Sequence, residues 1–191
     1  SYKKKKDNYI DWYPDGKINI FDNCITENIK LGLGKKIALY CVDKNKNIKS
    51  YSYETINKKV NFFSSVLISK LKNKRISSCK LMIHASASLE SSVAMLSCAK
   101  LGIHFSVIFE DLAPEAISTR VSIFKPDIFV SSFKKRFFKK NIYKKINYKK
   151  KLLFLFFEDQ KSFFSKKNIN IESKEISGNK ELFTLFTSVS N

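Results

Sequence analysis

The stretch from residue 88 to residue 109, SLESSVAMLSCAKLGIHFSVIF, decides the fold class. Ser88 is of a residue type that caps helix N-termini, and the small and apolar residues after it predict a helix as far as Leu101. Gly102 is a typical stop for this helix, because glycine readily adopts the left-handed conformation of a C-terminal cap. His104 to Phe109 is a short apolar run that is typical of a buried strand.

Strands and helices alternate on both sides of this stretch. Cys79 to Ala85 predicts a strand before it. After it, Pro114 fits the first turn of a helix that runs to Phe124, and Asp127 to Ser131 predicts another strand. Strands alternating with helices through short links are typical of a parallel sheet covered by helices. The fold class is therefore predicted as α/β, a largely parallel sheet flanked by helices.

Further elements are expected towards both ends of the chain. Lys36 to Val42 and Ile48 to Tyr53 predict the two strands of a hairpin. An amphipathic helix should follow, because apolar residues recur at helical spacing. These residues are Ile56, Val60, Phe63, Leu67 and Leu71. A short helix is expected from Phe21 to Lys30, and two more strands from Leu152 to Phe157 and from Leu182 to Thr187.

The net charge of +19 is the most unusual feature of the composition. One interpretation is a surface for nucleic acid or an anionic membrane. The other is a compositional bias, since the chain is rich in Lys, Asn, Ile and Phe, which AT-rich codons encode, and its lysines occur in nearly every segment. Only Arg75, Arg120 and Arg136 are arginines. Phosphate and base readers usually rely on the planar fork of arginine, so the composition favours bias over nucleic-acid binding.

Signals for metal binding, disulfides and membranes are weak. The cysteines at positions 24, 41, 79 and 98 have no C-x-x-C spacing, which favours reduced thiols, and His84 and His104 lie in apolar surroundings typical of core histidines. No apolar run reaches the roughly 18–20 residues of a membrane span. The basic start has no apolar stretch behind it, so it does not resemble a secretory signal, and a cytoplasmic location is expected.

Four segments carry a resemblance to a known family. They are WYPDGKIN at 12–19 with Asn23-Cys24 after it, SSVAMLSCAKLGIHFSVIF at 91–109, APEA at 113–116 with Arg120, and LFTLFTS at 182–188. In order and spacing they resemble the N-terminal part of AMP-forming acetyl-CoA and propionyl-CoA synthetases, members of the adenylate-forming superfamily. The fold expected from this resemblance is part of the N-terminal α/β domain of those enzymes.

The resemblance implies a domain plan and a reaction. Residues 1–8 would be a basic tail, 9–35 an N-terminal segment of the synthetase type, and 36–191 a partial, truncated AMP-binding domain. In that family, acetate or propionate attacks ATP with the help of Mg²⁺, which gives an acyl-adenylate and pyrophosphate. CoA then displaces AMP. Lys125 to Ser131 looks slightly more like the propionyl branch, and the choice between the two acids stays open.

The resemblance also implies candidate site residues for ATP. Thr187, Ser188 and Ser190 match hydroxyl positions of the loop that surrounds the ATP phosphates. Val189 stands where the family has glycine, and a β-branched residue tolerates positive φ poorly, so this loop should be strained or reshaped.

The candidate CoA residues are Arg136 and Lys139, which align with two phosphate-binding arginines of the family. Phe138 replaces a glycine between them. Glu110-Asp111 replaces a glycine pair close to CoA, and two carboxylates there would repel phosphates. No catalytic or metal-binding residue can be assigned, because the resemblance implies that they lie beyond residue 191.

Three functional hypotheses follow. The chain could be the N-terminal part of a synthetase and inactive alone. Its partner would then be the remaining part of a split or truncated enzyme, and the whole would act on carboxylate, ATP and CoA. It could be a degenerate homologue that kept the sheet and lost the chemistry, which Val189, Phe138 and Glu110-Asp111 favour. It could be a basic nucleic-acid or anionic-surface binding module built on the Lys/Phe-rich stretch 133–167.

Overall fold

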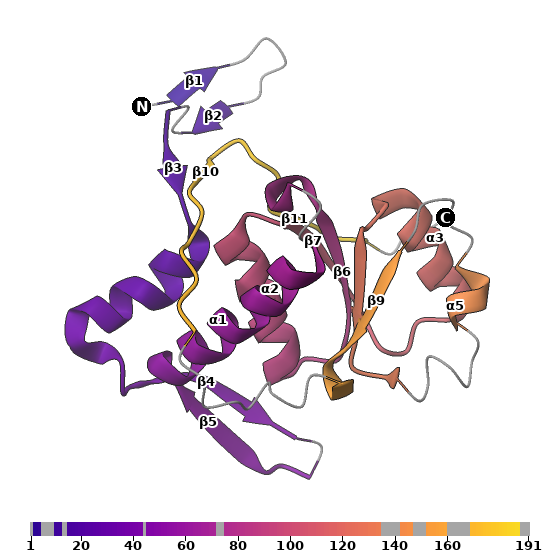
Figure 1. The fold of residues 1–191 in the computed structure, drawn as a ribbon, viewed down its shortest axis with the longest axis horizontal. Helices are drawn as coiled ribbons and strands as arrows, with labels where there is room; N and C mark the ends of the chain where they lie inside the picture. Colours follow the sequence, from indigo (N-terminus) through magenta and orange to yellow (C-terminus); the bar gives the residue numbers. More distant parts are fainter. Residues whose placement is uncertain are drawn as a thin grey trace.

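A five-stranded parallel sheet forms the centre of the protein in this computed structural model (Figure 1). The structure describes residues 2–4, 10–12, 15–43, 45–71, 75–134, 142–146, 152–159 and 169–187. The strand order is β11-β7-β6-β8-β9, and each neighbouring pair is parallel. The strands are β6 (Lys80–His84), β7 (His104–Ile108), β8 (Ile128–Ser131), β9 (Leu153–Phe156) and β11 (Phe183–Thr184).

Helices cover both faces of this sheet. Figure 1 shows α1 (Tyr53–Lys70) and α2 (Leu89–Leu101) on one side, and α3 (Pro114–Phe124) and α5 (Ile142–Lys145) on the other. The α/β class and the parallel sheet flanked by helices are therefore confirmed. The last two predicted strands are shorter than expected, most clearly β11, because only Phe183 and Thr184 pair with β7.

The ends of α2 follow from its sequence. The Ser88 Oγ accepts a hydrogen bond from the Ser91 N–H at 3.2 Å, and the Ser91 Oγ accepts one from the Ser88 N–H at 3.0 Å. This reciprocal pair satisfies donors that the first helical turn leaves open. Gly102 ends the helix in the left-handed conformation with φ 66°, as predicted.

The core divides into two layers because strand side chains alternate between the faces of the sheet. On β6, Leu81 and Ile83 belong to the larger cluster with α1 and α2, whereas Met82 belongs to the cluster with α3 and α5. Phe63 of α1 and Phe129 of β8 are fully buried in the larger and smaller clusters respectively. The two clusters hold the helices against the sheet from both sides.

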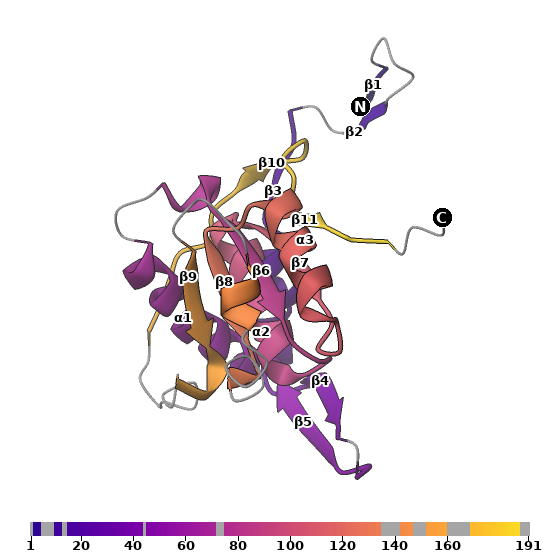
Figure 2. The same ribbon diagram turned by 90° about the vertical axis from the view of Figure 1, so that its right-hand side faces the viewer.

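Smaller elements surround this unit. They are β1 (Tyr2–Lys4), β2 (Ile10–Trp12), β3 (Lys17–Ile18), η1 (Asp22–Thr26), η2 (Ile29–Leu33), β4 (Ile37–Val42), β5 (Ile48–Ser52), η3 (Ile76–Ser78), η4 (Phe157–Asp159) and β10 (Ile176–Ser177). Residues 2–4, within the predicted basic tail, form a strand that pairs with β2. The predicted hairpin is β4 and β5, which projects below the sheet in Figure 2. The first predicted helix is present as η1 and η2, with π-helical hydrogen bonding, and η2 ends at Leu33.

Asn19 fastens the N-terminal segment to the sheet unit. Its buried side-chain amide donates hydrogen bonds to the carbonyls of Ala99, Lys100 and Lys174 at 3.0, 3.1 and 2.8 Å. Its Oδ1 accepts the Phe21 N–H at 2.9 Å. One side chain thus joins the end of α2, the start of the first helical segment and the segment that leads to β10.

The histidines and cysteines lie largely as expected. His84 and His104 are both buried, at 0% and 7% exposure, which confirms their prediction as core residues. All four cysteines are free; Cys79 and Cys98 are buried, and burial raises the pKa of Cys98. Within the described part of the chain, none of the helices combines the length and apolar character needed to cross a membrane.

Candidate functional site

The carboxyl edge of the sheet is the place where ligands are expected. In an open parallel sheet, ligands bind outside the carboxyl ends of the strands where the chain changes direction across the sheet. Here the chain passes from β6 to β7 on one side, then crosses to β8 on the other side of β6. The switch point therefore lies between the ends of β6 and β8.

A buried cluster fills this switch point. The His84 Nδ1 lies 3.0 Å from the Ser131 Oγ, and the Ser131 Oγ accepts the Phe133 N–H at 3.1 Å. The His84 ring also meets the Phe133 ring edge-on, with centroids 5.4 Å apart. His84 and Ser131 are both fully buried, and their contact joins the ends of β6 and β8.

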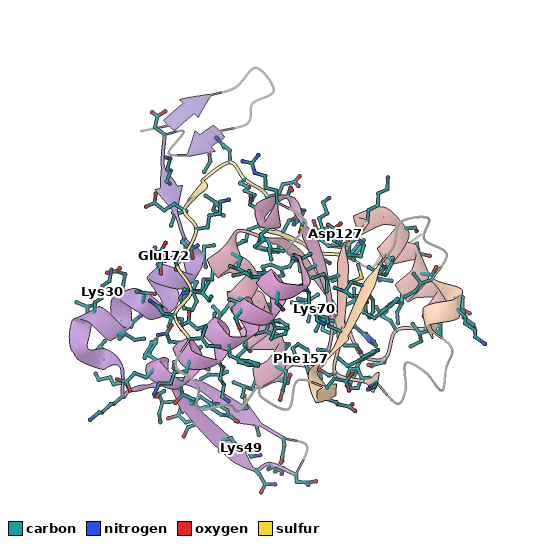
Figure 3. All side chains as sticks on the ribbon, in the orientation of Figure 1. Lys30, Lys49, Lys70, Asp127, Phe157 and Glu172 are labelled. Carbon is teal, nitrogen blue, oxygen red and sulfur yellow. The ribbon has the colours of Figure 1, made fainter. Side chains whose placement is uncertain are left out.

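A cavity of about 530 Å³ lies at the carboxyl ends of β6 and β7, between the hairpin and the beginning of α2. Its volume is within the range typical of small-molecule sites. The lining residues are Cys41, Val42, Asp43, Asn47, Lys49, Tyr51, Ser86, Ala87, Ser88, Leu89, Glu90 and Glu110. The described wall has two parts: the hairpin, on which Figure 3 shows Lys49, and the residues that follow β6 and β7 together with the start of α2.

Among the residues that the structure describes, the wall of this cavity carries more negative than positive charge. Its described carboxylates are Asp43, Glu90 and Glu110, and its one described cation is Lys49. The Asp43 Oδ1 accepts the N–H groups of Asn45 and Asn47 at 2.8 and 2.9 Å, and its Oδ2 accepts the Asn47 side-chain amide at 3.0 Å. These bonds hold the pKa of Asp43 below its usual value, and the bond from the Asn47 side chain has the largest effect.

Two weakly acidic groups in the same wall are kept protonated. Burial raises the pKa of Cys41, and the carboxylate of Glu90 adds to that effect. Burial likewise raises the pKa of Tyr51, with Cys41 and Glu90 contributing. The cavity therefore offers neutral donors and carboxylate acceptors, a lining that disfavours phosphate groups. Among the described residues, no group of three or more His, Cys, Asp or Glu side chains is arranged to hold a metal ion.

Thr187 is the one predicted ATP residue whose position the structure describes, and it is exposed. Because β11 runs parallel to β7, with Phe183 opposite Phe105, the chain leaves β11 towards the carboxyl edge. Ser188, Val189 and Ser190 lie outside the described residues. The role of Thr187, Ser188 and Ser190 in ATP binding therefore stays a prediction.

The predicted CoA residues Arg136 and Lys139, and Phe138 between them, also lie outside the described residues. The chain enters their segment from the carboxyl end of β8. Glu110 is described, and it follows β7 and lines the cavity. The contribution of the hairpin and of Glu90 to this wall was not predicted, because no local sequence signal shows that the hairpin packs beside the start of α2.

Comparisons with known proteins add three sequence relatives. No protein-family model matches the chain. Acetyl-coenzyme A synthetase of Leptospira biflexa serovar Patoc is 29% identical over 124 residues, which make up 64% of this chain and 18% of that protein. The Bartonella henselae acetyl-coenzyme A synthetase is 36% identical over 114 residues, or 59% of this chain and 17% of that protein. The Escherichia coli O157:H7 acetyl-coenzyme A synthetase is 31% identical over 112 residues, with the same shares. The chain spans less than a fifth of the length of these curated relatives.

A solved structure supports the same likeness at the level of the fold. The crystal structure of Brucella canis acyl-CoA synthetase matches with a TM-score of 0.73 at 14% identity, over 92% of this chain and 32% of that one. Sequence similarity to part of acetyl-CoA synthetases and the fold of an acyl-CoA synthetase together confirm the resemblance that the four motifs indicated.

Proposed function

We propose that this chain forms part of an AMP-forming acyl-CoA synthetase, which converts acetate or propionate with ATP and CoA to acyl-CoA, AMP and pyrophosphate. The observation that carries this proposal is the parallel pairing of β11 with β7. It brings two segments, far apart in the sequence and both similar to synthetase motifs, to one edge of the sheet. The pairing joins Phe183 to Phe105 and Thr184 to Ser106, and Glu110, which follows β7, lines the cavity.

The domain plan belongs to this proposal. Residues 36–191 would be the partial AMP-binding domain, 9–35 the N-terminal segment, and 1–8 a basic extension. The bonds of Asn19 support a fixed N-terminal segment, because they tie it to α2 and to the segment before β10. ATP phosphates would contact Thr187, Ser188 and Ser190, and Arg136 and Lys139 would contact CoA.

Two features support low activity for the chain alone. Val189 stands where the family has a glycine, and a glycine lets the backbone come close to the phosphates of ATP. Glu110 adds a carboxylate to a wall that already holds Asp43 and Glu90, so the CoA phosphates would meet like charge. ATP and its Mg²⁺ would supply the activation of the carboxylate, whereas the residues of this chain would only help to bind the nucleotide.

The outer edge of β11 supports a polypeptide partner. Phe183 and Leu185 are 54% and 68% exposed, and Phe109 at the end of the adjacent strand is 74% exposed. Figure 2 shows the chain running away from the sheet after β11. The Brucella canis structure is about three times as long as the part matched here. We therefore propose that the remaining part of a synthetase polypeptide adds a strand to this edge and covers these side chains.

The test is acyl-adenylate formation, measured as exchange between pyrophosphate and ATP with acetate or propionate. The chain alone should give no exchange above background. A chimera of the Escherichia coli O157:H7 enzyme that carries this chain in place of its matched segment should fold but exchange slowly. Adding Val189→Gly, Glu110→Gly and Asp111→Gly to the chimera should raise its exchange rate by at least about tenfold.

A matched control is the chimera with Lys35→Gly, Lys46→Gly and Lys125→Gly, which introduces three glycines outside the proposed phosphate loop and outside the lining of the cavity. A folded chimera that stays inactive after restoration of the three family glycines would contradict the synthetase function while leaving the fold intact. Preference for one acid in the restored chimera would be that of the Escherichia coli part, since its pocket comes from there.

A further inference from the structure

A second cavity lies at the opposite, amino edge of the sheet. Its volume is about 360 Å³, and Arg75, Ser77, Ser78, Lys174, Glu175, Ile176, Ser177 and Lys180 line it. These residues come from η3, which precedes β6, and from the segment that contains β10 and leads to β11. Asp127, labelled in Figure 3, marks the same edge, where its carboxylate accepts the Lys80 N–H at 2.9 Å. We refer to this cavity as the amino-edge pocket.

Three cationic side chains from separate places in the sequence converge on the amino-edge pocket. They are Arg75, Lys174 and Lys180, and Glu175 is the single carboxylate among the lining residues that the structure describes. Among the described residues, no ion pair is recorded for any of the three cations. The pocket therefore concentrates positive charge that the neighbouring side chains do not neutralise.

Hydrogen bonds hold two of these cations in place. Lys180 Nζ donates to the carbonyls of Ser77 and Gly102, each at 2.7 Å. Lys174 Nζ donates to the Ser77 Oγ at 3.0 Å. Burial lowers the pKa of Lys180 first, and the charges of Lys174 and Arg75 lower it further. An anion placed between these cations would relieve their mutual repulsion and stabilise their charged forms.

We propose that the amino-edge pocket binds a small anion that carries phosphate, either free or attached to a small organic group. Three cations beside the hydroxyls of Ser77, Ser78 and Ser177 match a group with multiple negative charges and several acceptor oxygens. The pocket is too small and too local for the extended basic track that a nucleic acid requires. Its lining does not include Thr187, the described residue of the proposed ATP loop, so the two sites are distinct.

Calorimetric titration of the full chain at about 0.15 M salt tests this proposal. Pyrophosphate and phosphate represent the free anion, and ribose 5-phosphate represents a phosphate on an organic group. We expect saturable binding at one site with a Kd on the order of 10⁻⁴ M for at least one of these probes. The double variant Arg75→Gln/Lys174→Gln should weaken it by at least about tenfold.

The control double variant is Lys35→Gln/Lys36→Gln, which removes the same amount of charge from exposed positions outside the pocket. It should change the Kd by less than about twofold, because exposed charges beyond a Debye length are screened. Glu175→Gln removes the one carboxylate of the lining and should tighten binding a few-fold, about two to five times. This third variant gains function, so loss of folding cannot explain its effect.

Equal weakening by the two double variants would overturn the proposal, because it would reduce the effect to net charge. Absence of saturable binding by all three probes would also overturn it. A single-stranded oligonucleotide that binds more tightly than pyrophosphate and depends more strongly on Arg75 and Lys174 would show a nucleic-acid surface instead. None of these outcomes bears on the synthetase function, which depends on the carboxyl edge.

Discussion

Gly102 shows at the scale of one residue how sequence and packing act together. Its φ of +66° is unfavourable for residues with a Cβ, and a Cβ added there would lie 2.8 Å from the Ile176 Cγ2. The variant Gly102→Ala should therefore destabilise the protein twice over. We expect a loss of about 2–4 kcal/mol in the free energy of unfolding, from backbone strain and from overpacking, measured by urea denaturation.

Gly32 provides a matched control for this substitution. Its φ is +78°, and nothing lies within 4 Å of the position that a Cβ would occupy. Gly32→Ala should cost only the backbone term, about 1–2 kcal/mol. Equal losses in the two variants would show that Ile176 yields without cost, and that β10 does not press on the end of α2.

At the scale of elements, β11 and β7 form the shortest strand pairing of the sheet, with two paired residues. Beyond these, the contacts include the Phe105 N–H, which donates to the Leu182 carbonyl at 3.0 Å, and the His104 Nε2, which lies 2.8 Å from the Thr184 Oγ1. Burial lowers the pKa of His104, and the charge of Lys80 lowers it further. Glu181 acts in the opposite direction, and Lys180 acts in the same direction as Lys80.

The lowered pKa of His104 makes stability depend on pH. The folded protein favours the neutral imidazole, so the contribution is complete above the unfolded pKa of about 6.5 and is lost as the pH falls through the lower folded pKa. We expect the urea midpoint to fall as the pH is lowered below about 6.5, and His104→Gln to make that fall shallower. If the urea midpoint of the His104→Gln variant changes with pH as steeply as that of the wild type, the pH dependence belongs to other groups.

Sequence patterns predicted the elements whose signals are local. Ser88 and Gly102 mark the two ends of α2, and Pro114 marks the start of α3, because capping and φ preferences act within a few residues. The two cavities were not predicted, since their walls combine segments that only tertiary packing brings together. Arg75 and Lys180 are separated by more than half of the chain, yet they line one pocket. The candidate residues for ATP and CoA came from the family resemblance, and only Thr187 among them lies in the described part.

At the scale of the whole molecule, the net charge of +19 opposes compactness. Lysines are spread over nearly every element, so folding brings like charges closer together, and added salt should relieve this repulsion. Exposed ion pairs such as Lys30–Glu27 and Lys145–Glu115 oppose this trend, but pairs in full contact with solvent contribute little to stability. We therefore expect the free energy of unfolding to rise by about 1–2 kcal/mol between low and high sodium chloride.

The choice of anion separates general screening from the amino-edge pocket. Chloride should stabilise the wild type and the Arg75→Gln/Lys174→Gln variant alike, because screening acts on all charges. Phosphate at the same ionic strength should stabilise the wild type further, since a ligand that binds only the folded state adds stability in proportion to its saturation. A free energy of unfolding that falls with sodium chloride would mean that ion pairs outweigh the repulsion between like charges. The positions of the lysines would then reflect ion pairing and not only the compositional bias of the chain.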